Sequence, residues 1–266
     1  MNSTPPPAAA DSFRIAQPRR HLPAMQGVID RRMLVNFRCD PAVLARLIPR
    51  PFRPQLVRGW GMAGICLIRL KHLRPRWLAS SLGFTSENAA HRIAVEWDEA
   101  GQSRAGVFIP RRDTNSRLNH WAGSRLFPGV HHLARFDISE DQDQFKLNMH
   151  SDDEAASVRV SAHLAKEWAA GSVFPTLEEA SAFFAAGSLG WSAGNRPGEL
   201  DGLELYTEQW HMEPLHVDHV ESTYFDNPNE FPPGTMEFDS AILMRNIQHE
   251  WHARGRMICD NHHRLP

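Results

Sequence analysis

The amino-acid sequence predicts a mainly β protein with peripheral helices, an α+β fold. The segment SVRVSAHL (157–164) alternates apolar and polar residues, which is the pattern of a half-buried strand. Two apolar runs, 93–97 and 104–110, flank the turn DEAGQ and indicate a β-hairpin. The strongest helix signal is TLEEASAFFAAG (176–187), where Thr176 and the glutamate three residues later form a capping box.

The first predicted strand is RRMLVNFR (31–38), and a short helix is expected to follow over DPAVLARLIP (40–49). Asp40 is suited to cap the N-terminus of that helix, and Pro41 is suited to its first position. A second strand is expected over GMAGICLIRL (61–70).

After the hairpin, SRLNHWAGSRLF (116–127) is expected to form a helix. Two further strands, HLARFDIS (132–139) and FKLNMHS (145–151), flank the acidic turn EDQDQ. In the best helix, Gly187 stands where a left-handed residue would end it. The segment SAILMRNIQHEW (240–251) is ambiguous, because its apolar residues have helical spacing while its composition also suits a buried strand.

The chain has 266 residues, enough for one large domain. The N-terminal segment MNSTPPPAAADS is rich in proline and polar residues, so residues 1–20 are expected to be a disordered tail rather than a signal peptide. Since no linker or internal repeat interrupts the rest, residues 21–266 are expected to form a single domain. Three widely spaced cysteines without a CxxC pair are typical of reduced thiols in a cytoplasmic protein.

Composition argues against two classes of partner. A formal net charge of −2 is not that of a general nucleic-acid-binding protein. The sequence has no apolar run near the roughly 18 residues that a membrane span needs. Of the 29 basic residues, only Lys71, Lys146 and Lys166 are lysines, so lysine chemistry has few candidates.

The 15 histidines do not suggest a metal site. The pairs in HVDH (216–219) and HEWH (249–252) are spaced i, i+3, which in a strand places the two rings on opposite faces. The adjacent pairs at 131–132 and 262–263 face apart for the same reason. Since GxSxG, P-loop and GxGxxG motifs are also missing from the sequence, we expect neither a metal nor a cofactor.

Polar side chains gather at the open end of the predicted hairpin. SENAAHR (86–92) leads into its first strand, and RRDTN (111–115) leaves its second. Glu87 and Arg111 are therefore expected near the same end of the sheet. They either belong to a structural ion pair or bind a carboxylate, with Glu87 as acid or base.

A resemblance to a known family rests on four runs, in this order: VNFRCDPAVLARLIPRPFRPQLVRGWGMAGICLIRL, SENAAHRIAVEW, RAGVFIPRRDTNS and STYFDNPNEFPPGTMEFDSAILM. Over about residues 28–252 the chain resembles the DUF2071 proteins, a family of unknown function related to acetoacetate decarboxylases. The resemblance implies an acetoacetate decarboxylase-like β-barrel with a central pocket.

In the decarboxylases, a strand end reading roughly G-F-P-K-K supplies a Schiff-base lysine, and IPRRD stands at that place here. The resemblance puts Arg111 at the nucleophile and Arg112 on its neighbour, while Glu87 matches the family's active-site acid by position. A guanidinium stays protonated and cannot form an imine, so Schiff-base decarboxylation from this position is excluded. Lys71 is an alternative amine, but its surroundings, LKHLRPR, predict a solvated and cationic setting.

We therefore expect a barrel pocket that binds a small anionic or keto-acid ligand. Catalytic roles are expected for Glu87 and Arg111, and substrate-binding roles for four residues that follow: Arg112, Asp113, Asn115 and His120. Two classes of function stay open, a lyase- or hydratase-type enzyme without a Schiff base and a binding protein that has lost decarboxylase chemistry. A homo-oligomer also stays open.

Overall fold

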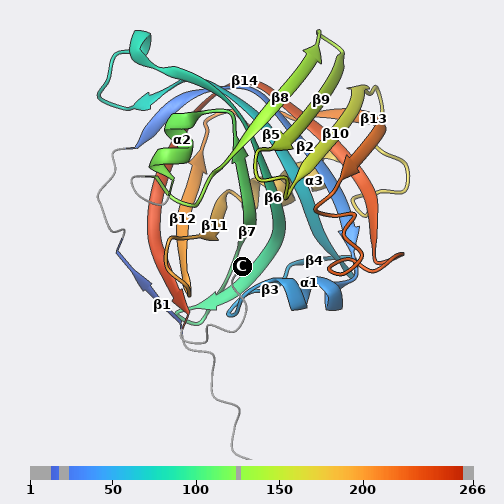
Figure 1. The fold of residues 1–266 in the computed structure, drawn as a ribbon. Helices are drawn as coiled ribbons and strands as arrows, with labels where there is room; N and C mark the ends of the chain where they lie inside the picture. Colours follow the sequence, from blue (N-terminus) through green and yellow to red (C-terminus); the bar gives the residue numbers. More distant parts are fainter. Residues whose placement is uncertain (1–12, 18–23, 124–126, 260–266) are drawn as a thin grey trace, which may run out of the picture.

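The computed structural model describes residues 13–17, 24–123 and 127–259, in which strands far outnumber helices (Figure 1). The elements are β1 (Phe13–Ala16), β2 (Met25–Cys39), α1 (Pro41–Leu47), β3 (Arg53–Pro54), β4 (Leu56–Val57), β5 (Trp60–Pro75), the 3-10 turn η1 (Ser80–Leu82), β6 (Phe84–Glu99), β7 (Gln102–Thr114), α2 (Arg117–Ala122), β8 (His132–Glu140), β9 (Gln144–Ser151), β10 (Ser157–Leu164), α3 (Leu177–Ala186), β11 (Leu189–Ala193), β12 (Glu199–Tyr206), β13 (Glu213–Ser222) and β14 (Met236–Cys259). The predicted mainly β fold with peripheral helices is confirmed.

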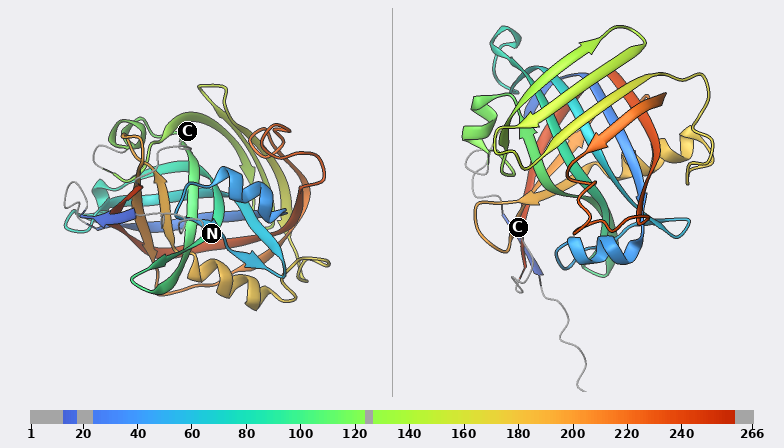
Figure 2. Two further views of the ribbon diagram at one scale, coloured as in Figure 1. Left: turned by 90° about the horizontal axis from the view of Figure 1, so that it is seen from below. Right: turned by 45° about the vertical axis from the view of Figure 1, so that its right-hand side comes forward.

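Strand pairing closes into two rings that share one wall (Figure 2). The shared wall is β14–β2–β5–β6–β7 in hydrogen-bonded order. In the small ring, β11 and β12 connect β7 back to β14. In the large ring, β8, β9, β10 and β13 make that connection.

The shared wall is buried on both faces, so each ring has its own hydrophobic core. Because side chains alternate across a strand, neighbouring residues of the wall enter different cores. Met33 and Leu67 belong to one core with residues of β9 and β10. Leu34 and Ile68 belong to the other, together with Phe184 of α3.

The N-cap predictions for Asp40 and Thr176 are confirmed, but the carboxylate of Glu179 lies 3.5 Å from Arg58 and its return bond to the N–H of Thr176, which a capping box needs, is not among the hydrogen bonds of the described residues. The side chain of Asp40 accepts a hydrogen bond from the N–H of Ala42 at 2.8 Å, and that of Thr176 accepts one from the N–H of Glu179 at 3.2 Å. The prediction for Gly187 is wrong, since its φ of −84° is not left-handed and its N–H continues the helical pattern to the carbonyl of Phe183.

Two other elements differ from expectation. The predicted helix over 116–127 is confined to α2, which ends at Gly123; residues 124–126 lie outside the described segments. The ambiguous segment 240–251 is part of β14, because its backbone pairs with β2 along nearly its whole length. Pairing on both sides of a strand outweighs the helical spacing of its side chains.

Part of the predicted N-terminal tail is ordered. Phe13–Ala16 forms β1 and pairs antiparallel with the end of β14. Residues 1–12 and 18–20 of that tail lie outside the described segments. In the segments that the structure describes, every helix is too short or too polar to cross a membrane.

Candidate ligand-binding site

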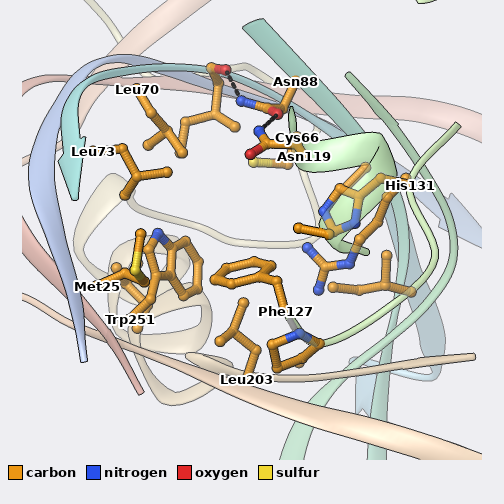
Figure 3. Close-up of a pocket in the computed structure, with 18 of the residues that line it drawn as sticks. Met25, Cys66, Leu70, Leu73, Asn88, Asn119, Phe127, His131, Leu203 and Trp251 are labelled. Carbon is orange, nitrogen blue, oxygen red and sulfur yellow. Dashed lines mark hydrogen bonds between the residues drawn. The ribbon is translucent and has the colours of Figure 1, made fainter. Parts of the chain in front are cut away.

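A cavity of about 460 Å³ lies within the small ring. Every strand of that ring contributes to its lining, together with α2, the β5–β6 connection and residues of the α2–β8 and α3–β11 connections (Figure 3). The volume falls in the range of about 300–1,000 Å³ that is typical of small-molecule sites. Most lining side chains are apolar, so the few polar ones define where charge can bind.

The two consecutive arginines of β7 face different rings. The side chain of Arg112 lines the cavity. Arg111 does not line it; its guanidinium donates a hydrogen bond of 2.8 Å to Asp113 and one of 2.7 Å to Asp153. Ser151 accepts a further bond from Arg111. Arg111 is therefore held in an ion-pair cluster on the large-ring side.

Glu87 also lies on the large-ring face of the wall. Its carboxylate accepts a hydrogen bond of 2.6 Å from Arg31 and another from Arg69. Both arginines bind Glu140 as well, and Arg69 is 3.3 Å from Asp30. The charge of Glu87 is therefore compensated inside the protein, and its side chain does not line the cavity.

The remaining predicted residues contribute little to the cavity itself. Asp113 borders it, but its carboxylate accepts from Arg111 on the other face. Asn115 and His120 are exposed: the Asn115 side chain accepts from the N–H of Glu87 at 3.0 Å, and Nδ1 of His120 donates to the carbonyl of His131 at 2.6 Å. The structure thus does not bring Glu87 and Arg111 into one cavity with Arg112. Alternation places Glu87 opposite in direction to Asn88. On β7, a bulge opposite Arg92 puts Arg112, and not Arg111, on the face of Ile109.

The guanidinium of Arg112 is largely removed from water, and no carboxylate of the described residues forms an ion pair with it. Its Nε donates a hydrogen bond of 2.8 Å to the hydroxyl of Ser192. Burial lowers the pKa of Arg112 to about 10, although the nearby carboxylate of Asp201 opposes this. Arg112 still carries its proton at neutral pH.

Arg92 is a second guanidinium on the cavity wall; Arg92 is buried, whereas Arg112 is half-buried, and the sequence analysis does not identify Arg92 as a site residue. It donates to the side-chain oxygen of Asn36 at 2.5 Å and lies 4.8 Å from the ring centroid of Phe184. Its Nε has no hydrogen-bond partner in the described segments, nor does Arg92 form an ion pair there. Burial lowers the pKa of Arg92 to about 10, and repulsion by Arg32 adds to this. Arg92 follows Ala90 by two residues and Asn88 by four, so the three side chains share one face of the strand. This spacing is the sequence signal that would have identified Arg92 as a site residue.

Uncharged polar groups of the cavity wall are Asn88, Asn119, His131 and Cys66, and Arg32 and Arg74 line the cavity as well. Nδ1 of His131 lies 3.0 Å from the carbonyl of Gly129. A carbonyl only accepts, so Nδ1 carries the proton and Nε2 is an acceptor. Burial, followed by repulsion from Arg112, lowers the pKa of His131 to about 3, and the ring is neutral at pH 7.

None of the three lysines, all in described segments, lines the cavity. Lys71 is half-exposed and its Nζ lies 2.7 Å from a carboxylate oxygen of Asp30. Across the described ranges, no group of three His, Cys, Asp or Glu side chains is arranged to hold a metal. The pair at 262–263 lies outside those ranges.

The double-ring fold is that of solved acetoacetate decarboxylase-like proteins. An acetoacetate decarboxylase from Legionella pneumophila subsp. pneumophila str. Philadelphia 1 superposes with a TM-score of 0.58 at 12% identity, over 97% of this chain and 93% of that one. An acetoacetate decarboxylase-like enzyme from Sphingomonas wittichii RW1 gives 0.51 at 13% identity, over 90% and 92%. The enduracididine biosynthesis enzyme MppR, complexed with pyruvate, gives 0.57 at 9% identity, over 90% and 91%.

At these identities the likeness establishes the fold alone. The family profile DUF2071, an uncharacterized conserved protein, matches residues 29–241, and the chain belongs to this family. No curated protein sequence matches the chain significantly.

Proposed function

We propose that this protein binds a small organic carboxylate of the keto-acid class in the small-ring cavity. The observation that carries the proposal is the pair Arg92 and Arg112, two desolvated guanidiniums without an ion-pair partner among the described residues. An uncompensated buried charge costs several kcal/mol, which an anionic ligand would offset. A carboxylate matches the planar fork of a guanidinium in shape and charge.

The structural comparison supports the keto-acid class. MppR shares the fold and was crystallised with pyruvate, a molecule that combines a carboxylate with a ketone. In this chain, Arg112 would bind the carboxylate of such a ligand. Asn119, whose amide nitrogen makes only long hydrogen bonds of 3.4 Å within the protein, is the neutral polar group of the wall that suits its ketone oxygen.

A lyase- or hydratase-type enzyme without a Schiff base is the second candidate, and His131 favours it. Its neutral imidazole is close enough to Arg112 for that charge to depress its pKa, and Nε2 is an acceptor. A carboxylate bound at Arg112 would remove this repulsion, raise the pKa of His131 and so make it a better base. Glu87 and Arg111, which lie behind the wall, are proposed to act by supporting β6 and β7. The non-catalytic alternative keeps the same binding site.

Thermal unfolding with pyruvate and with its methyl ester tests the proposal. Pyruvate should raise the melting temperature through mass action, whereas the neutral ester should not. Arg112→Gln and Arg92→Gln should each lose the shift, because each removes a charge from the cavity. Arg196→Gln, which changes an exposed arginine, is the matched control and should keep it.

Equal pyruvate shifts in all four proteins would contradict the proposal. An NMR time course of the same keto acid then separates the two candidates. Conversion that is lost in His131→Gln supports an enzyme, and binding without conversion supports the non-catalytic reading.

A further inference from the structure

Away from Arg92 and Arg112 most of the cavity lining is apolar, with Asn88 opposite Ile68 and Arg74 after Leu73 as polar residues. Figure 3 shows Asn88, Asn119 and His131 on one side, opposite Met25 and Trp251. A molecule of pyruvate's size bound at the arginines would leave the apolar side in contact with water. A cavity of about 460 Å³ has room for a much larger ligand.

The polar and apolar parts succeed one another along paired strands. Cys66 of β5 lies opposite Ala90, which in turn lies opposite Arg112. Further along β5 the lining residues are Ile68, Leu70 and Leu73, followed by Arg74 and Pro75. The guanidinium of Arg74 donates to the backbone carbonyls of Leu78 and His72, at 3.1 and 2.9 Å. At about 3.3 Å per residue, the regular stretch from Cys66 to Leu70 spans roughly 13 Å, and the strand is irregular from Leu70 to Leu73. This is an apolar path that begins beside the guanidinium of Arg112.

The apolar path ends at the protein surface. Leu82, on the β5–β6 connection, lines the cavity and is 65% exposed. Leu118 of α2 also lines the cavity and is 53% exposed. Residues that line the cavity and are also exposed to solvent mark the mouth of the cavity. Exposed leucines at a mouth are costly in water and would be covered by an apolar part of a ligand.

We infer that the ligand of this site is a carboxylic acid with a long apolar tail, its carboxylate at Arg92 and Arg112 and its tail along β5 toward Leu82. The inference rests on the proposed function, keeps its carboxylate at the arginines and adds a long apolar tail to the ligand. The arginines provide charge recognition, and the wall from Ile68 to Leu73 provides affinity that grows with tail length.

Calorimetric titration with propanoate, octanoate and dodecanoate below their micelle concentrations tests the inference. Each buried methylene contributes about 0.8 kcal/mol, which corresponds to nearly fourfold in Kd, so octanoate should bind at least on the order of a hundredfold more tightly than propanoate. Octan-1-ol, which has the same tail without the charge, should bind far more weakly than octanoate. Arg112→Gln should remove the preference for the acid over the alcohol.

Substitution of an exposed leucine at the mouth, and of another elsewhere on the surface, tests whether the tail of the ligand reaches the mouth. Leu82→Asn should weaken dodecanoate several-fold and leave propanoate unchanged. Leu56→Asn is the matched control, because Leu56 is 52% exposed and does not line the cavity. Both positions are at the surface, so neither variant is expected to disturb folding. If Arg112→Gln fails to fold, Arg92→Gln provides the same comparison of acid and alcohol.

The outcomes separate this inference from the proposed function. Equal affinity across the acid series, still dependent on Arg112, would overturn the long tail and leave keto-acid binding in place. Absence of binding by every acid, pyruvate included, would overturn both. Octan-1-ol binding as tightly as octanoate would refute the role of the arginines. Equal effects of Leu82→Asn and Leu56→Asn would refute the path to the mouth.

Discussion

Arg111 and Arg112 are adjacent on β7, yet one is paired with the buried carboxylate of Asp113 and the other lines a cavity without an ion pair among the described residues. Alternation along the strand is the cause, because the strand belongs to a wall with a ring on each side. The two arginines should therefore respond to mutation in opposite ways.

Arg111→Ala should destabilise the protein by about 3–5 kcal/mol, because Asp113 is fully buried and would lose its partner. Urea denaturation measures this loss. Arg196→Ala, at an exposed position, should change the free energy of unfolding by less than about 0.5 kcal/mol. Equal small changes in both variants would show that the cluster around Arg111 contributes nothing to stability.

Arg112→Met should leave the stability of the ligand-free protein unchanged or increase it, since it removes a desolvated cation and keeps an apolar side chain of similar length. The same variant should lose the stabilisation by pyruvate or octanoate. Melting temperatures with and without ligand provide both values. A large loss of ligand-free stability would indicate that Arg112 is a structural residue.

The protein should lose stability between pH 6.5 and pH 5. Burial lowers the pKa of three histidines: that of His91 to about 3, that of His131 to about 3 and that of His249 to about 4. The unfolded chain binds protons at these positions below pH 6.5 and the folded chain does not, so stability falls as the pH falls. Each group contributes up to about 1.4 kcal/mol per pH unit.

Urea denaturation at several pH values tests the histidine effect. His91→Gln should reduce the slope of unfolding free energy against pH over this range. His216→Gln, at an exposed position, should leave the slope as it is in the wild type. An unchanged slope in His91→Gln would contradict a neutral buried imidazole at His91.

Treatment with acetoacetate and borohydride should leave the mass of the protein unchanged. An imine needs a neutral amine, and neither Arg112 nor any of the three lysines provides one to the cavity. Mass spectrometry of the intact protein detects a reduced adduct. An adduct mapped to Lys71 would contradict the exclusion of Schiff-base chemistry.

Alkylation of Cys66 should report on the cavity, because it is the cysteine that lines it. Iodoacetamide should modify Cys66 before Cys39, whose burial raises its pKa to about 12. Pyruvate or octanoate should slow the reaction at Cys66 by occupying the cavity. Peptide mapping measures the rate at each cysteine, and a rate at Cys66 that does not depend on ligand would place the binding site elsewhere.

Much of the fold follows from local sequence. The alternation of 157–164 predicts β10, and the side chains of Asp40 and Thr176 cap the helices where their spacing predicts. These features depend on neighbours in the chain, so they can be recognised without the tertiary structure. The polar strand end with Arg112 was also recognisable, through its resemblance to the DUF2071 pattern.

The sequence by itself determined that this chain is a mainly β member of its family, with an arginine in place of the expected lysine. Only the tertiary structure decided which side chains share the cavity. Both faces of the shared wall are buried. Alternation along a strand predicts that Arg111 and Arg112 lie on different faces, but it does not predict which face of the wall borders the cavity. Arg92 joins Arg112 through strand register, a relation between distant segments that residue spacing along the chain does not contain.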